Sequence, residues 1–187
     1  MIDYYNIHRS IEYYDSIGFQ RVEVPWTVTK QISDITRPRD KADYQLKHND
    51  KVLVASAEQS FLYQYVKGFL PSGSFQAVTP CFRDDMFDET HSKYFIKNEL
   101  IITCDTSEDS LHNMIEHAVE FFKISLKESE IKIIKTGHLE YDIEYMGVEL
   151  GSYGIRETSF LRWIYGTACA EPRLSYCQRL KKNELSP

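Results

Sequence analysis

The chain has 187 residues, which suits one domain and is too short for two domains of ordinary size. Hydrophobic residues make up 42% and charged residues 27%, so the chain can bury a core without disulfides or metals. Its 22 basic and 28 acidic residues give a net charge of −6, which excludes a chain-wide positive field for nucleic acid but allows a local basic groove.

The first half of the chain shows clear signals for helix and strand ends. Apolar residues recur at helical spacing over 3–17, and Gly18 follows where a glycine commonly closes a helix. An alternating segment then stops at Pro25. The predicted elements are a helix at 3–17, a strand at 19–24, a hairpin of 43–47 with 51–55, a helix at 57–69, and strands at 74–82 and 93–104.

The clearest helical pattern covers residues 108–127, where apolar side chains form one stripe. Short strands follow, with glycines at turns, and Pro172 stands where a helix can begin because the first turn tolerates proline. These strands are predicted at 131–135, 139–146, 148–156 and 160–170. Consecutive short strands favour an α+β fold, in which helices flank an antiparallel β-sheet.

Neither the N-terminus nor any later segment indicates export or a membrane. The first residues lack the basic segment and apolar run of a signal peptide, and no stretch approaches the roughly 18 apolar residues of a membrane helix. The four cysteines have no CxxC spacing and fit neither a zinc cluster nor a disulfide framework. We therefore expect a cytoplasmic protein whose thiols are mostly buried and reduced.

Three segments together resemble the signature motifs of class II aminoacyl-tRNA synthetases. They are Gly18-Phe19-Gln20-Arg21-Val22-Glu23-Val24-Pro25, then Phe82-Arg83-Asp84-Asp85 with His91-Ser92-Lys93-Tyr94-Phe95-Ile96-Lys97-Asn98-Glu99, and finally Tyr165-Gly166-Thr167-Ala168-Cys169-Ala170-Glu171-Pro172-Arg173. They occur in the family's order, and the resemblance extends from about residue 3 to residue 180. It implies a class II synthetase-like catalytic domain over residues 1–187, without an anticodon-binding domain.

The first segment resembles motif 1, a helix followed by a glycine, a strand and a proline. In the family this element builds the dimer interface, so the resemblance implies a homodimer through residues 3–25. By itself the pattern is weak, because a helix, glycine, strand and proline in this order are common in unrelated proteins.

The second segment contains residue types suited to ATP. Arg83 has a permanent charge and a planar fork, so it can bridge an α-phosphate and a carboxylate. The resemblance implies that His91 meets the β- and γ-phosphates, that Phe95 stacks on adenine, and that Asp85, shorter than the family's usual Glu, contacts adenine. The alternative is that Arg83 forms a surface ion pair with Asp85 or Glu99 and that Phe95 belongs to the core.

The third segment resembles motif 3, a strand of small residues that leads to an arginine at a helix start. Small residues such as Gly166 let a nucleotide lie close to the backbone, and Arg173 adds a cation to the positive end of the helix dipole. Two expected glycines are replaced by Ala168 and Ala170, and Pro172 replaces an acid. A small-residue strand before a capped helix is the alternative interpretation.

Two further segments agree with the same resemblance. Ser56-Ala57-Glu58 resembles a Thr-x-Glu element in which the Glu holds a substrate ammonium; a plain helix cap explains the same residues. The run from Glu149 to Arg156 resembles a strand whose Glu and small polar residue bind the metal on ATP, so Glu149 and Ser152 are candidate Mg²⁺ ligands. Solvation of an outward-facing Glu149 is the alternative.

The resemblance implies an ATP-dependent ligase that activates an amino acid as its adenylate, with ATP and Mg²⁺ as cofactors. The acceptor is tRNA, a protein or carrier, or ammonia. A tRNA acceptor is not favoured, because four acids lie in the loop that approaches it: Asp84, Asp85, Asp88 and Glu89. The alternative function is a non-catalytic paralogue that binds an amino acid or nucleotide and regulates a partner.

Overall fold

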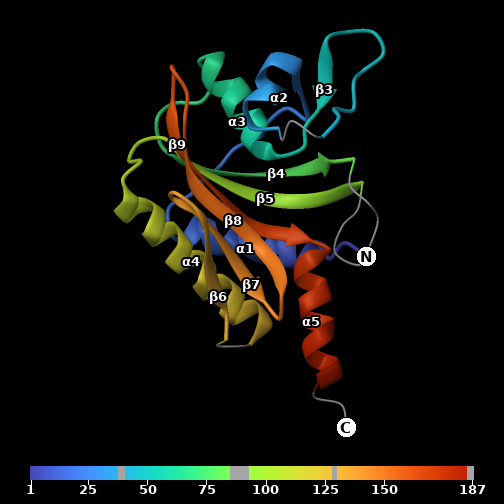
Figure 1. Ribbon diagram of the computed structural model, residues 1–187, viewed down its shortest axis with the longest axis vertical. Helices are drawn as coiled ribbons and strands as arrows, with labels where there is room; N and C mark the ends of the chain where they lie inside the picture. Colours follow the sequence, from blue (N-terminus) through green and yellow to red (C-terminus); the bar gives the residue numbers. More distant parts are fainter. Residues whose placement is uncertain (38–40, 85–92, 128–129, 185–187) are drawn as a thin grey trace.

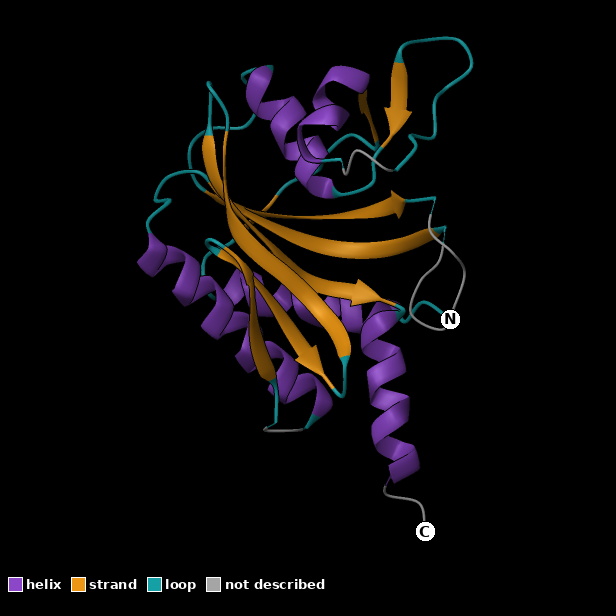
Figure 2. Ribbon diagram, viewed as in Figure 1, coloured by secondary structure: helices purple, strands orange, loops and turns teal. Residues whose placement is uncertain are grey.

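The computed structural model describes residues 1–37, 41–84, 93–127 and 130–184, and shows a twisted sheet between helices (Figure 2). The main sheet has seven strands, which are antiparallel except where β1 pairs with β4. In spatial order they are β1 (Gln20–Arg21), β4 (Ser74–Phe82), β5 (Tyr94–Ile102), β9 (Arg162–Glu171), β8 (Val148–Glu157), β7 (Glu140–Tyr145) and β6 (Lys132–Gly137). The predicted α+β class is confirmed.

Two amphipathic helices cover one face of this sheet, α1 (Tyr4–Ser16) and α4 (Glu108–Leu126) (Figure 1). Side-chain caps fix where they begin, since Asp3 accepts from the backbone of Tyr5 and Ser107 from that of Ser110. Their apolar stripes pack with strand residues into the larger core. The predicted helices at 3–17 and 108–127 are therefore confirmed, and Gly18 has the positive φ of +96° that favours glycine after a helix.

A smaller layer packs on the opposite side, against β4, β5 and β9. It contains α2 (Lys30–Thr36), α3 (Ala57–Val66), and a two-stranded sheet of β2 (Thr27–Thr29) and β3 (Lys51–Leu53). A second apolar core, which includes Val28, Phe61 and Trp163, joins this layer to the sheet. The layer covers only part of the sheet, so the remaining surface can form the wall of a site.

In and around this layer, two predicted elements are only partly present in the structure. The strand expected at 19–24 is reduced to β1, whose two residues pair with β4. The expected hairpin forms in part, because Val52 bridges Gln45, and the N–H groups of Leu46 and Leu53 donate to the carbonyls of Lys51 and Tyr44. The other edge of β3 pairs with β2. Val28 of β2 is completely buried, so its packing against the second core stabilises this long-range pairing, which the sequence did not indicate.

The C-terminal part agrees closely with expectation. The strands predicted at 131–156 and 160–170 correspond to β6, β7, β8 and β9, and α5 (Arg173–Glu184) begins directly after Pro172. Burial explains part of the tyrosine content, since Tyr14, Tyr145 and Tyr153 belong to the larger core. Across the described ranges, every helix is too short or too polar to span a lipid bilayer.

Candidate functional site

A cavity of about 310 Å³ lies between the sheet and the smaller layer. Eight of the residues singled out in the sequence line it, although they come from segments that are distant in the chain: Ser56, Glu58, Arg83, Phe95, Glu149, Ser152, Gly166 and Arg173. The candidates Asp85 and His91 fall outside the described residues. The tertiary structure therefore brings the described candidates together at one site.

Strand β5 supplies the central wall of the cavity. Because side chains alternate along a strand, Phe95, Lys97 and Glu99 share one face, and all three line the cavity. The pairing with β9 shifts by one residue beside Asn98 and Glu99, which is a β-bulge. Such bulges re-aim side chains, and on β9 both Thr167 and Ala170 line the cavity despite their odd spacing of three.

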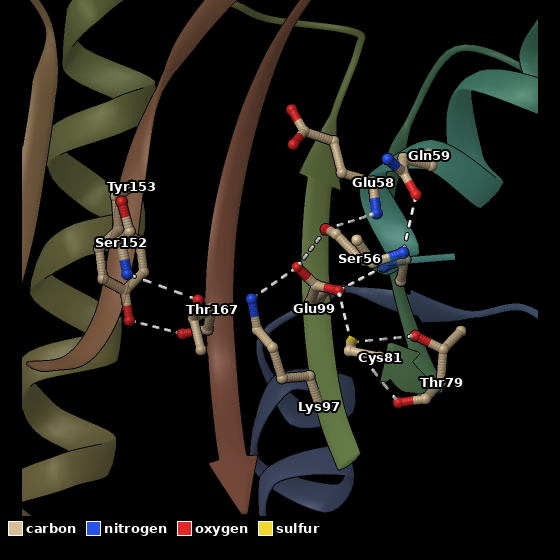
Figure 3. A network of polar contacts seen from close by, with 12 residues as sticks. Ser56, Glu58, Gln59, Thr79, Cys81, Lys97, Glu99, Ser152, Tyr153 and Thr167 are labelled. Atoms are coloured by element: carbon tan, nitrogen blue, oxygen red, sulfur yellow. Dashed lines mark hydrogen bonds and ion pairs between the residues drawn. The ribbon is translucent and has the colours of Figure 1, made fainter. Parts of the chain in front are cut away.

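The Glu99 carboxylate joins this wall to the start of helix α3 (Figure 3). It accepts hydrogen bonds from Ser56 Oγ at 2.7 Å, from Lys97 Nζ at 2.8 Å and from the backbone N–H of Ala57. The Cys81 thiol lies 3.9 Å away as a weak fourth donor. Burial by itself raises the pKa of Glu99, but Lys97, Ser56 and Ala57 outweigh burial and leave that pKa below its usual value.

Ser56 performs the capping role that the sequence suggested, because its Oγ accepts the N–H of Glu58 at 3.2 Å. Glu58 then reaches across the cavity to β8 and β9. Its carboxylate oxygens lie 2.5 Å from Arg156 Nη1 and 2.7 Å from Trp163 Nε1. Burial raises the pKa of Glu58, while Arg156 and Trp163 oppose that rise. Arg156 also stacks on Tyr165, with its guanidinium 4.1 Å from the ring centre.

Arg83 lies at the end of β4 beside Phe95. Its Nε donates to the carbonyl of Ala55 at 3.0 Å, and its guanidinium lies 5.1 Å from the centre of the Phe95 ring. The alternative ion pair with Glu99 does not form, because Glu99 pairs with Lys97. Both Arg83 and Phe95 line the cavity, so the motif 2 residues face a shared space.

Arg173 and Glu149 form an ion pair of 2.7 Å at the start of α5. A third group, Asp142 on β7, lies close to this pair. Burial raises the pKa of Asp142, and the charges of Glu149 and Glu144 raise it further, while the hydroxyl of Ser152 and the charge of Arg173 oppose the rise. The carboxylates of Asp142 and Glu149 therefore repel each other across the β7–β8 pairing.

Two carboxylates with a hydroxyl suit a Mg²⁺ ion that also binds phosphate oxygens. Among residues 1–37, 41–84, 93–127 and 130–184, no group of three or more His, Cys, Asp or Glu side chains forms a preformed metal centre. Magnesium commonly binds through only one or two carboxylates plus phosphates. The residues therefore fit a metal that arrives with a nucleotide.

Gly166 is required by packing behind the cavity. A Cβ on this residue would lie 2.5 Å from Met114 Sδ and 2.8 Å from Tyr153 Cδ1, both in the larger core. Only glycine therefore fits between the cavity wall and helix α4, whether or not a nucleotide also approaches the backbone.

Sequence reasoning missed four residues of this site: Asp142, Lys97, Arg156 and Tyr165. The alternation of Phe95, Lys97 and Glu99 along one predicted strand was a usable signal for Lys97. The contact of Arg156 with Glu58 had no such signal, because the two lie almost a hundred residues apart. Cys81 also borders this network, but burial raises its pKa to about 12, so it stays a thiol and is not a nucleophile.

Comparison with solved structures identifies proteins that share this fold. The chain superposes on pyrrolysyl-tRNA synthetase from Desulfitobacterium hafniense with a TM-score of 0.72 and 14% identity, covering 95% of this chain and 68% of that one. Seryl-tRNA synthetase from Pyrococcus horikoshii, complexed with ATP, gives a TM-score of 0.65 and 20% identity, covering 90% of this chain and 47% of that one. The cytoplasmic serine-tRNA ligase from Naegleria fowleri, in complex with AMP, gives a TM-score of 0.66 and 16% identity. The match covers 92% of this chain and 52% of that one.

No protein-family model and no curated protein matches the sequence. The structural likeness establishes the fold, which is that of a class II aminoacyl-tRNA synthetase catalytic core. The chain spans about half the length of the two seryl enzymes. At these identities the likeness describes architecture, and activity must be argued from the cavity itself.

Replacing Glu99 by Gln tests the role of this carboxylate in stability. At neutral pH the variant should lose about 3–5 kcal/mol of unfolding free energy, because Lys97 stays buried without its counter-charge. The folded protein lowers the pKa of Glu99, so its contribution is present above the ordinary value of 4.5 and is lost as the pH falls through the lowered value. The difference in unfolding free energy between wild type and variant should therefore become smaller at acid pH.

Chemical denaturation at neutral and acid pH measures this difference. Glu157→Gln is the matched control, since its pair with Arg162 is largely exposed, and its effect should stay within about 0.5 kcal/mol. A Glu99→Gln variant as stable as the control at neutral pH would contradict a structural role for the Glu99 network.

Proposed function

We propose that this protein activates an amino acid with ATP and forms an aminoacyl-adenylate. The observation that carries the proposal is the convergence of Glu58, Arg83 and Arg173 on one cavity from three distant segments. An ammonium, an α-phosphate and terminal phosphates need these three kinds of group. The solved structures with this fold add support, because two of them are described as complexes with ATP or AMP.

The charge of the cavity supports an anionic ligand. Although the chain carries −6 overall, the described lining residues include six cations and four acids: Arg37, Lys41, Arg83, Lys97, Arg156 and Arg173 against Asp43, Glu58, Glu99 and Glu149. A cleft with this excess of positive charge attracts a polyphosphate locally. Lys97, Arg156 and Arg173 are paired with acids, and these ion pairs fix the positions of the three cations before a ligand binds.

In the proposed reaction a substrate carboxylate oxygen attacks the α-phosphorus of ATP, and pyrophosphate leaves. The protein forms no bond itself, so its contribution is positioning and charge neutralisation. We assign Arg83 to the α-phosphate and the substrate carboxylate, and Arg173 to the terminal phosphates. Glu58 takes the substrate ammonium, since its carboxylate has two protein donors and about four acceptor positions.

The nucleotide end of the cavity follows from the same assignments. Phe95 offers an aromatic face to adenine, and the Arg83 guanidinium lies 5.1 Å from the centre of that ring. Gly166 lines the cavity through its backbone. The proposed roles of His91 at the terminal phosphates and of Asp85 at adenine concern residues outside the described ranges, and they rest on the sequence resemblance.

Magnesium would be held by Glu149, with Ser152 and Asp142 beside it. Bound there, it would neutralise phosphate charge. The raised pKa of Asp142 reflects burial and the adjacent carboxylates of Glu149 and Glu144, and a cation would relieve that repulsion. Arg173 contacts Glu149 Oε1 at 2.7 Å, so the same carboxylate also orients the arginine.

Pyrophosphate exchange into ATP, screened across the standard amino acids, tests the activity. We expect exchange with one amino acid or a small set. Arg83→Ala should lower that exchange by at least about 100-fold, because the cation beside the α-phosphate is lost, while the fold is retained. The control is Arg162→Ala, an arginine that pairs with Glu157 on the surface.

Undiminished exchange in Arg83→Ala would refute the assignment of Arg83. Binding of an amino acid or nucleotide without exchange by the wild type would instead identify a non-catalytic binding protein. The wild type tests the activity, and the Arg83→Ala variant tests the role of Arg83, so one can fail without the other.

Substitution of the two carboxylates tests the metal assignment. Wild-type protein should gain more thermal stability from ATP with Mg²⁺ than from ATP alone, because a metal-bound ligand completes the site. Glu149→Gln combined with Asp142→Asn should remove that extra gain and leave the effect of ATP alone. An equal Mg²⁺ effect in the variant would place the metal elsewhere. Glu157→Gln, an exposed carboxylate at the end of β8, serves as the control.

We also propose a homodimer through residues 3–25. Helix α1 leaves Tyr4 and Tyr5 largely exposed, each with 67% of its surface accessible. Sedimentation should give twice the chain mass of 22.0 kDa, and Tyr4→Glu with Tyr5→Glu should shift the protein toward monomer. Phe69→Glu, an exposed aromatic outside this segment, is the control. A monomer at all concentrations would contradict the proposal.

A further inference from the structure

Lys97 is a buried cation without an assigned role. Only 9% of its surface is accessible, and its ammonium contacts Glu99 at 2.8 Å. An ammonium has three donor hydrogens, and within the described part of the chain Glu99 is its single partner. Burying a charge is costly unless its hydrogen bonds are made, so the remaining donors favour an anionic ligand in the cavity that Lys97 lines.

The strand register fixes where Lys97 lies along the cavity. On β5, Glu99 pairs with Thr167, Lys97 with Ala170, and Ile96 with Glu171, just before Arg173. In the other direction β9 leads to Tyr165, which stacks on the Arg156 that contacts Glu58. Lys97 therefore lies between the Glu58 end of the cavity and the end that carries Arg173 and Glu149.

Hydrogen-bond capacity separates the two buried carboxylates. Glu99 already has four donors, namely Ser56, Ala57, Lys97 and the weak donor Cys81, which is about the number that a carboxylate accepts. Glu58 has two, and it therefore keeps capacity for an ammonium. Ser56 links the two acids, since it donates to Glu99 and caps the N–H of Glu58.

The small side chain of Ala170 lies opposite Lys97 on β9, and both line the cavity. Arg83 contributes a second cation on the same wall. Both Lys97 and Arg83 lower the pKa of the Cys81 thiol, although burial dominates and raises it, so both charges lie near that residue. A carboxylate between these two cations would have donors on two sides.

We propose that Lys97 Nζ binds the carboxylate of the amino-acid substrate, which makes it a further catalytic residue. The inference rests on the proposed function and adds a residue to it. Glu58 holds the ammonium of the zwitterion, Lys97 holds its carboxylate, and Arg83 faces the α-phosphate. One carboxylate oxygen forms a bond to the α-phosphorus, the bond from that phosphorus to the bridging oxygen breaks, and pyrophosphate leaves with the electron pair. No proton is transferred.

The test compares an amino acid with its amino alcohol, which keeps the ammonium and replaces the carboxylate by hydroxymethyl. Calorimetric titration measures both ligands on the wild type and on Lys97→Met. We expect the variant to lose roughly 10- to 100-fold in affinity for the amino acid and little for the alcohol, because one charged hydrogen-bond donor is removed. ATP affinity should be unchanged.

Lys132→Met is the matched control, an exposed lysine on strand β6, and should bind both ligands as the wild type does. Lys97→Met leaves Glu99 buried without its counter-charge, so a double variant with Glu99→Gln removes both charges and keeps the test valid if the single variant unfolds. An unchanged preference for the amino acid in a folded Lys97 variant would overturn the inference. So would a loss of ATP affinity in place of amino-acid affinity.

Pyrophosphate exchange by the wild type separates this inference from the proposed function. If the wild type exchanges and Lys97→Met keeps its KM and kcat, only the role of Lys97 fails. If the wild type does not exchange pyrophosphate, the proposed activity is refuted. The calorimetric titration of Lys97→Met then uses the amino acid that raises the thermal stability of the wild type most. Loss of the amino-acid preference in Lys97→Met then still supports the inference, whereas no binding by any amino acid overturns it.

Discussion

The buried carboxylate of Glu99 is the interaction on which the candidate site depends. It binds the hydroxyl of Ser56 and the N–H of Ala57, and so fixes the start of helix α3 on the sheet, while its contact with Lys97 fixes a cation on the same strand. Glu58 lies in the first turn of that helix. A buried ion pair of this kind contributes less to stability than well-packed apolar groups of the same size. Its benefit is geometric, because it places donors and acceptors at defined points of one cavity.

Acidic composition and an anion-binding cavity are compatible because electrostatic fields act locally. The net charge of −6 describes the whole chain, whereas the described lining of the cavity carries more cations than acids. Salt screens charges that lie more than about 10 Å apart at moderate ionic strength, so the distant surface acids have little effect on a bound phosphate. The pairs of Arg173 with Glu149 and of Arg156 with Glu58 fix the direction of each guanidinium.

The opposite face of the sheet constrains the cavity from behind. Helix α4 contacts the sheet so closely that Gly166 has no room for a Cβ beside Met114. The β-bulge beside Glu99 changes which β9 side chains face the cavity, and both Thr167 and Ala170 line it. Ala170, one of the two alanines that replace family glycines, lies opposite Lys97 in the strand register. The replacement of that glycine by Ala170 therefore still leaves a small side chain opposite Lys97.

The sequence by itself determined the main helices and strands, since helical spacing over 108–127 and alternation over 74–82 are local patterns that caps and turns reinforce. Motif resemblance also identified Arg83, Glu58 and Arg173 as residues that would share a site. Tertiary structure alone decided the pairing of β2 with β3, because that pairing depends on the burial of Val28 against the second core. It likewise decided that Asp142 lies beside Glu149 and that Arg156 meets Glu58, because contacts between distant segments depend on strand register and packing, which no local pattern records.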